Sequence, residues 1–422
     1  MKLLRLIAMF LLSCFVSMFV FPIGFSFFPA SLNTKMVIGV LGIVAYIWDS
    51  IHKREATFHK TTLFALMLAM VFSVWCFFTM VANGTPDTSY ATYFVSFSVW
   101  LGGAYAVCAM IRGFHGKINL PILVQYLVFV SVAQCALALA IDHYPGFKAI
   151  VDTYVQQGQE FFTKVHRLYG IGAALDPAGC RFAIILTLLA HLVSTDDRVV
   201  GNRLQLFLAL VSFCIITIVG CMISRTTIVG TGLGLAYMFF WLAMPRRGVL
   251  TRRKLRFLGS FVGIVAIAVV ISVWQYITSP ESMANFRFAF EPFFNYFETG
   301  EFSSGSTDKL NGTMWIWPDT TREWLIGTGW FGFFHFSTDI GYCRFVLYCG
   351  VIGLSLFSLF FLYDASVVWR KFKDFKFVTL LLVVLTFVIW IKVATDIFWI
   401  YALLFCLPYE NGEPEADPEP EE

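Results

Sequence analysis

The sequence predicts an all-α integral membrane protein that crosses the bilayer about twelve times. Its 422 residues are 58% hydrophobic and only 14% charged, and the mean hydropathy is +0.75. Soluble domains are less apolar and carry roughly 25% charged residues. The apolar residues also gather in long runs, whereas the strands of a transmembrane barrel would alternate over about 10 residues. These observations exclude a soluble enzyme and a barrel.

Twelve apolar segments approach the ~20 residues that a helix needs to span a bilayer. They cover residues 5–26, 35–50, 61–81, 90–111, 119–141, 179–194, 204–223, 226–244, 257–277, 343–363, 376–391 and 394–408. The first follows Lys2 and Arg5, as in a signal peptide, but its apolar run continues uncharged to Phe28. Because this run is too long for a signal peptide, we expect an uncleaved first helix.

The positive charges orient the bundle. Loops on one side hold 19 of the 30 Lys and Arg residues, so that side and both termini are predicted to be cytoplasmic. The same rule divides the apolar block 204–243. Arg203 lies next to its start and Arg246 follows it, so both ends are cytoplasmic and the chain is expected to turn at Arg225 on the outer face.

The segment 376–408 leaves two alternatives open, since it offers little length for two spans. It forms either two short spans that turn near Lys392 or one long helix. One long helix would give eleven spans and would place Lys392 and Asp396 in mid-membrane as an i, i+4 pair.

We expect one transmembrane domain over residues 1–408 with a disordered acidic cytoplasmic tail over 409–422. Only two loops are long, at about 142–178 and 278–342, and both are predicted to lie outside. Long loops that are ordered often carry function.

Eleven Lys and Arg residues fall outside the cytoplasmic set, although outer loops are normally poor in them. They are Lys35, Lys148, Lys164, Arg167, Arg181, Arg225, Arg287, Lys309, Arg322, Arg344 and Lys392. A cationic cavity on the outer face would suit an anion such as the diphosphate of a lipid-linked precursor. Local pairing or snorkelling of each side chain is the alternative for most of them, and Arg225 at a hairpin tip is the strongest exception.

The second long loop concentrates aromatic residues. Trp315, Trp317, Trp324 and Trp330 could stack on sugar rings, or they could anchor the loop at the membrane interface. Thr320 and Glu323 have the spacing of a capping box, which predicts a short helix there.

Three residues near the outer face could transfer protons: His166, His335 and Asp339. The chain has no phosphate-binding loop, no nucleophile elbow and no metal-ligand pattern, so we expect no cofactor and no metal. Nothing in the charge pattern suggests nucleic acid as a partner.

Three segments together resemble the O-antigen polymerase and ligase superfamily of bacterial surface-polysaccharide assembly. The first runs from His166-Arg-Leu-Tyr-Gly through Asp176-Pro-Ala-Gly, and the second is Ile223-Ser-Arg-Thr-Thr. The third is Gly327-Thr-Gly, then Asp339, then Gly350-Val-Ile-Gly. The resemblance covers roughly residues 160–400. The ligases of this superfamily have a His at a fixed spacing before the Gly-x-x-Gly. Counted back from Gly350, that position is Asp339 in this chain, and His335 lies four residues too early to replace the His. The departure favours a polymerase over a ligase.

The resemblance implies a fold similar to the C-type glycosyltransferases and metal-independent glycosyl transfer at the periplasmic face of the inner membrane. A growing chain on undecaprenyl diphosphate would be moved as a block onto a lipid-linked repeat unit. Other partners would be membrane lipid, a chain-length regulator and a flippase.

On this interpretation Arg225 and Arg167 bind the diphosphate, with Arg181, Arg322 and Lys392 in support. Asp339 orients or deprotonates the acceptor hydroxyl, with His335 and His166 as rivals. A ligase on the same scaffold is the nearest alternative. A transporter or flippase for a lipid-linked anion is the second.

Overall fold

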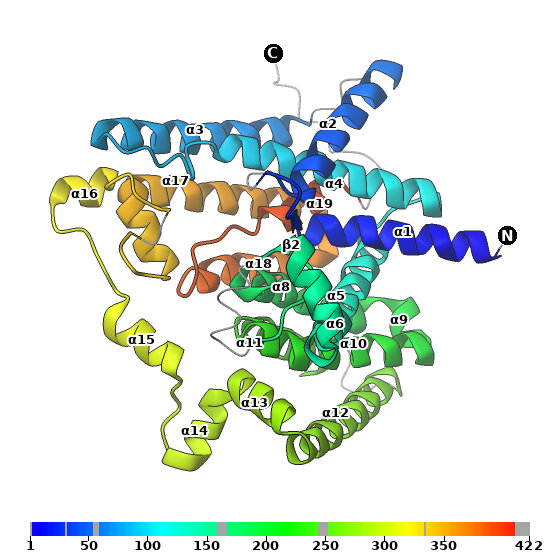
Figure 1. Ribbon diagram of the computed structural model, residues 1–422. Coiled ribbons are helices and arrows are strands. Elements are labelled where there is room, and N and C mark those ends of the chain that lie inside the picture. Colours follow the sequence, from blue (N-terminus) through cyan, green and yellow to red (C-terminus); the bar gives the residue numbers. More distant parts are fainter. Residues whose placement is uncertain are drawn as a thin grey trace.

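The computed structural model describes residues 2–29, 32–53, 59–157, 167–243, 252–332 and 335–409, and they are mostly helical (Figure 1). Nine helices within these ranges are long and apolar enough to cross a membrane. They are α1 (Lys2–Val20), α2 (Thr34–Lys53), α3 (Lys60–Asn83), α4 (Tyr93–His115), α5 (Leu120–His143), α8 (Leu175–Thr195), α10 (Arg203–Ile223), α12 (Arg252–Thr278) and α17 (Gly341–Lys371). The prediction of an all-α membrane protein is therefore confirmed. The acidic tail 410–422 lies outside the described residues.

Three further helices occupy predicted spans but are shorter. They are α11 (Thr227–Ala243), α18 (Lys376–Ile389) and α19 (Phe398–Cys406). The chain between Ile389 and Phe398 is not helical, so one long helix over 376–408 is wrong. Irregular backbone at membrane depth requires protein around it. Here Trp390 donates its indole N–H to the carbonyl of Thr395 at 2.7 Å, and α19 is almost entirely buried.

The predicted outer loops fold into short elements. The first holds α6 (Pro145–Tyr154) and β2 (Val155–Gln156), which pairs antiparallel with β1 (Gly24–Phe25) after α1. This pairing explains why α1 ends at Val20 and not at residue 26. The second loop holds α13 (Pro280–Ala289), α14 (Glu291–Thr299), α15 (Gly305–Thr313) and α16 (Thr321–Ile326), which run along one edge of the molecule (Figure 1). The remaining short elements are α9 (Asp197–Gly201) and the 3-10 turn η1 (Lys373–Phe375).

The most buried of the candidate spans is α8, because 89% of the residues in its apolar stretch are buried. It packs against α11, α10, α5 and α18. A central helix can place its first residues at a fixed position, and those residues include Asp176. We call the end of the bundle that holds the start of α8 and the turn between α10 and α11 the tip end. The charge bias predicts that it faces outward.

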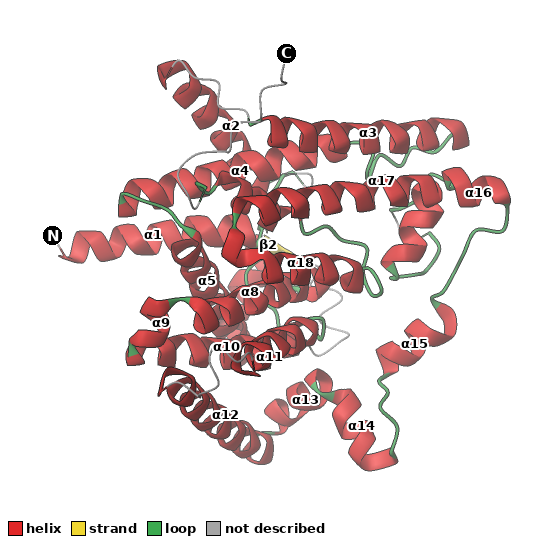
Figure 2. Cartoon of the chain, turned by 180° about the vertical axis from the view of Figure 1, so that it is seen from behind, coloured by secondary structure: helices red, strands yellow, loops and turns green. Residues whose placement is uncertain are grey.

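The third motif, Gly327-Thr-Gly with Gly350-Val-Ile-Gly, coincides with a break in helix α17. Gly350 has φ 68° and ψ 179°, which interrupts the helical hydrogen bonds. The freed carbonyl of Leu347 accepts from the backbone N–H and the hydroxyl of Thr328, and that of Tyr348 accepts from the Gly329 N–H. The indole N–H of Trp75 donates to the Cys349 carbonyl at 2.8 Å. These three carbonyls are therefore satisfied by Trp75 of α3 and by the segment that follows α16, which lies beside α17 (Figure 2).

We expect Gly350→Ala to destabilise the protein by about 2–4 kcal/mol, because a left-handed φ and a steric overlap both penalise a side chain there. A Cβ at this position would lie 2.1 Å from the Leu325 carbonyl oxygen. The control is Gly259→Ala on α12, where a Cβ meets nothing within 4 Å. Thermal unfolding of the detergent-solubilised variants, followed by tryptophan fluorescence, measures the difference. Equal melting of both variants and the wild type would contradict the proposed role of the break.

Candidate functional site

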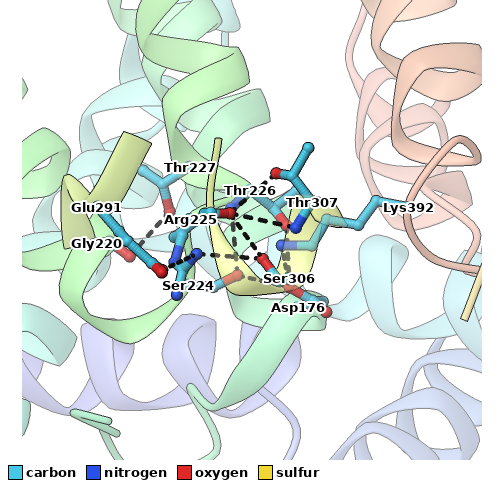
Figure 3. A network of polar contacts seen from close by, with 11 residues as sticks. Asp176, Gly220, Ser224, Arg225, Thr226, Thr227, Glu291, Ser306, Thr307 and Lys392 are labelled. Carbon is cyan, nitrogen blue, oxygen red and sulfur yellow. Dashed lines mark hydrogen bonds and ion pairs between the residues drawn. The ribbon is translucent and has the colours of Figure 1, made fainter. Parts of the chain in front are cut away.

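A partly buried carboxylate at the tip end joins three elements. Asp176, in the first turn of α8, accepts hydrogen bonds at Oδ1 from the hydroxyls of Ser224 (2.8 Å) and Thr226 (3.0 Å) (Figure 3). The Nζ of Lys392, in the irregular segment between α18 and α19, lies 3.4 Å from the same oxygen. An acidic group in the first turn of a helix is also favoured by the helix dipole. Asp176 thus fixes the turn between α10 and α11 and brings Lys392 to it.

Arg225 lies at this turn, as the sequence predicts. Its Nη1 is 2.7 Å from Glu291 Oε2 and donates to the Ser306 hydroxyl at 3.1 Å (Figure 3). The guanidinium also lies over the ring of Phe288, 4.3 Å from its centroid. Only 15% of the Arg225 side chain is exposed. The three partners come from α13, α14 and α15, so the second outer loop folds back onto the turn.

Arg167 shares the same ring, with its guanidinium 4.7 Å from the Phe288 centroid. The predicted pair of Arg225 and Arg167 is thus brought together around one aromatic side chain. Burial lowers the pKa of Arg167, and Arg225 adds to that effect, while Asp176 and Asp339 oppose it. Two guanidiniums held this close favour a ligand with more than one negative charge.

Asp339, an exposed residue two positions before α17, lies beside the same charges. Burial and the neighbouring Asp176 raise the pKa of Asp339, and Arg344, Lys392 and Arg167 act against that rise. The raised pKa suits a group that accepts a proton, because a stronger base accepts it more readily.

Arg181 continues the cationic cluster into the bundle. It lies on α8 beyond Asp176, with its Nε buried and without a hydrogen-bond partner. Asp396 acts electrostatically on Arg181 and on Lys35, whose Nζ lies 4.5 Å from the Trp100 centroid. Lys35 was among the eleven outer cations but was not predicted to be a site residue. The sequence feature that could have identified Lys35 as a site residue is its positive charge at the start of an apolar helix.

Arg322 lies on α16, apart from the cluster around Arg225. Its guanidinium donates to the side-chain oxygen of Asn83 and to the carbonyl of Ala82, both at 3.0 Å, and so ties α16 to the end of α3. Figures 1 and 2 both show α16 well apart from α11. The expectation that Arg322 supports the same anion as Arg225 is not met, because its chain neighbours pack on α3 and α17.

The four predicted tryptophans form two groups. Trp315, Trp317 and Trp324 make an exposed ladder with centroid distances of 5.9 and 5.4 Å, next to α16, whose capping box of Thr320 and Glu323 is present. Trp330 stacks on His335 with centroids 5.1 Å apart. None of these rings has a described contact with Arg225. His166 lies outside the described residues.

An apolar groove of about 930 Å³ is lined in part by residues that are close to Arg225 in the chain. Helices α10, α11 and α12 form its walls, and phenylalanines of α13 and α14 cover it. Ile228, one turn after Arg225, lines the groove, and so does Phe290, which precedes Glu291. Two residues of the groove wall are therefore close neighbours in the chain of the residues around the cationic pair.

Within the described residues, no group of three or more His, Cys, Asp or Glu side chains could hold a metal ion. Comparisons with protein-family models, with curated proteins and with solved structures each found no match.

Proposed function

We propose that the protein is a glycosyltransferase that polymerises lipid-linked oligosaccharide repeat units at the tip end of its membrane domain. One observation carries the proposal: Arg225 and Arg167 flank Phe288, and Ile228 and Phe290, their near neighbours in the chain, line an apolar groove of about 930 Å³. Such a site suits a ligand with an anionic head and a long apolar tail. An undecaprenyl diphosphate carrier has both.

In the proposed reaction the bond between the anomeric carbon of the donor chain and its diphosphate oxygen breaks. The acceptor hydroxyl oxygen bonds to that carbon, and the hydroxyl proton passes to Asp339. Negative charge grows on the departing diphosphate, where Arg225 and Arg167 stabilise it. The carrier diphosphate is released, and no metal is required for this charge balance.

The cellular setting follows from the same proposal. The chain lies in the inner membrane of a bacterium, with both termini cytoplasmic and the tip end facing the periplasm. The product is O-antigen, capsule or exopolysaccharide. The repeat units come from a flippase, and a chain-length regulator acts with the enzyme.

Deleting the gene should reduce the surface glycan to single repeat units, and wild type but not Arg225→Ala should restore long chains. Removing the guanidinium leaves the departing diphosphate without its main counter-charge, so we expect a rate loss of about 100-fold or more. Surface glycan resolved by size on gels, with lipid-linked intermediates extracted in parallel, gives the readout. Arg287→Ala is the control, because Arg287 lies on the same outer loop but pairs with Glu298 in an exposed bridge.

Two outcomes would contradict this reading. Long lipid-linked polymer accumulating beside bare acceptor would identify a ligase. An unchanged glycan profile, or full polymer with Arg225→Ala, would remove the basis for a diphosphate site at Arg225.

Glu291→Gln should strengthen binding of undecaprenyl diphosphate by about tenfold, because the carboxylate occupies Arg225 at 2.7 Å and the ligand must displace it. Purified protein in lipid nanodiscs, titrated with undecaprenyl diphosphate, provides the measurement. Glu298→Gln is a matched control, since it removes a second α14 glutamate that pairs with a different arginine. Equal affinities for the two variants would mean that the diphosphate does not compete with Glu291.

Asp339→Asn should lower the transfer rate by about 10²–10⁴-fold if Asp339 accepts the hydroxyl proton. The carboxylate form is the active one and its pKa is raised, so the wild-type rate should fall as the pH is lowered through that pKa. Rates measured against pH with purified protein test both points. Asp319→Asn, at the exposed start of α16, is the control. A wild-type rate that is independent of pH in the acid range would argue that Asp339 is not the base.

A further inference from the structure

A second pocket, of about 400 Å³, opens at the tip end between α5, α6, α13 and the segment before α8. Asp142 and Ile141 line it from the end of α5, Glu281 and Asn285 from α13, and Arg167 from the segment before α8. Its size falls in the range of roughly 300–1,000 Å³ that holds small ligands.

The lining differs from that of the apolar groove. Asn285 donates from its amide nitrogen to Asp142 Oδ2 at 3.2 Å, and Glu281 acts electrostatically on the same carboxylate. Lys148 and Tyr169 complete the polar part of the wall. Lys148 and Arg167 balance the two carboxylates, so the wall has no excess charge that would favour an ion, and its polar groups disfavour a hydrocarbon tail. Carboxylates and an amide facing one cavity suit a neutral ligand that carries many hydroxyl groups.

The pocket adjoins the cationic pair through shared residues. Arg167 lines the pocket and also lies over Phe288 beside Arg225. Glu281, Asn285 and Phe288 follow one another at helical spacing along α13, so one face of this helix contributes to both places. A hydroxyl of a molecule in the pocket would therefore lie next to an anion bound at Arg167.

We propose that this pocket binds the acceptor saccharide, with Asp142 and Asn285 as the residues that recognise its hydroxyl groups. This inference rests on the proposed function, because it divides the two substrates of that reaction between two places. The lipid diphosphate lies at Arg225 and in the groove, and the acceptor sugar lies in the pocket. Arg167 is the side chain common to both.

Two probes separate the two places. The first is undecaprenyl diphosphate, which lacks sugar. The second is the free saccharide released by mild acid from lipid-linked intermediates of the deletion strain, which lacks lipid and diphosphate. Each is titrated against the purified full-length protein in nanodiscs. The variants are Asp142→Asn, Arg225→Ala and Glu301→Gln, the last being a carboxylate of the second outer loop that does not line the pocket.

Asp142→Asn should weaken saccharide binding about tenfold or more and leave undecaprenyl diphosphate binding unchanged. Arg225→Ala should do the reverse, and Glu301→Gln should change neither. Ala284→Trp provides a second variant that fills the pocket from its exposed lining residue without removing a charge. It should also abolish saccharide binding.

Saccharide binding that is absent in the wild type, or unaffected by both Asp142→Asn and Ala284→Trp, would overturn the acceptor pocket. That result would leave the diphosphate site standing. Undecaprenyl diphosphate binding that is indifferent to Arg225→Ala would instead overturn the proposed function.

Discussion

The tip end depends on the compensation of one partly buried carboxylate. Asp176 opens the most buried of the candidate spans, and an uncompensated charge there would be very costly. The hydroxyls of Ser224 and Thr226 and the ammonium of Lys392 supply the compensation. Each of these groups belongs to a segment where a helix is interrupted. Since 25% of the Asp176 side chain and 32% of the Lys392 side chain are exposed, water compensates part of the charge, and these contacts supply the rest.

The remaining charges of the site are held in a similar balance. Arg225 and Arg167 would repel each other if nothing intervened, and Glu291 and the face of Phe288 reduce that repulsion. A cationic site for a diphosphate has to remain stable when the ligand is absent. An internal carboxylate on a separate short helix achieves this, because it can be exchanged for the ligand without dismantling α8, α10 or α11. Competition with Glu291 lowers the apparent affinity of the proposed site for the diphosphate.

The sequence was sufficient for features that depend on composition and local order. The positive charges on both sides of the block 204–243 correctly predicted a turn at Arg225, and the spacing of Thr320 and Glu323 correctly predicted a capped helix. Features that depend on distant partners were not accessible. Arg322 is held by Asn83, 239 residues away, and Phe288 is recognisable as part of the site only after α13 has folded back onto the turn. Hydropathy likewise could not decide the form of 376–408, because it measures apolar length and not which groups satisfy the backbone.

The start of α17 and the irregular segment between α18 and α19 are also in direct contact. The backbone N–H of Tyr342, at the start of α17, donates to the carbonyl of Trp390 at 3.1 Å, so the start of α17 is fixed to the irregular segment that carries Lys392. Asp339 immediately precedes this contact, and Lys392 pairs with Asp176. The position of Asp339 relative to the arginines is therefore set by a short chain of contacts through Trp390 and Lys392 to α8. Because the break at Gly350 lies only nine residues further along α17 and is held by the Gly-x-Gly segment, the first part of α17 is anchored at both of its ends. For the proposed proton acceptor, this anchored backbone reduces the rearrangement needed to reach a working geometry, which is the condition under which a single carboxylate can contribute strongly to a transfer reaction.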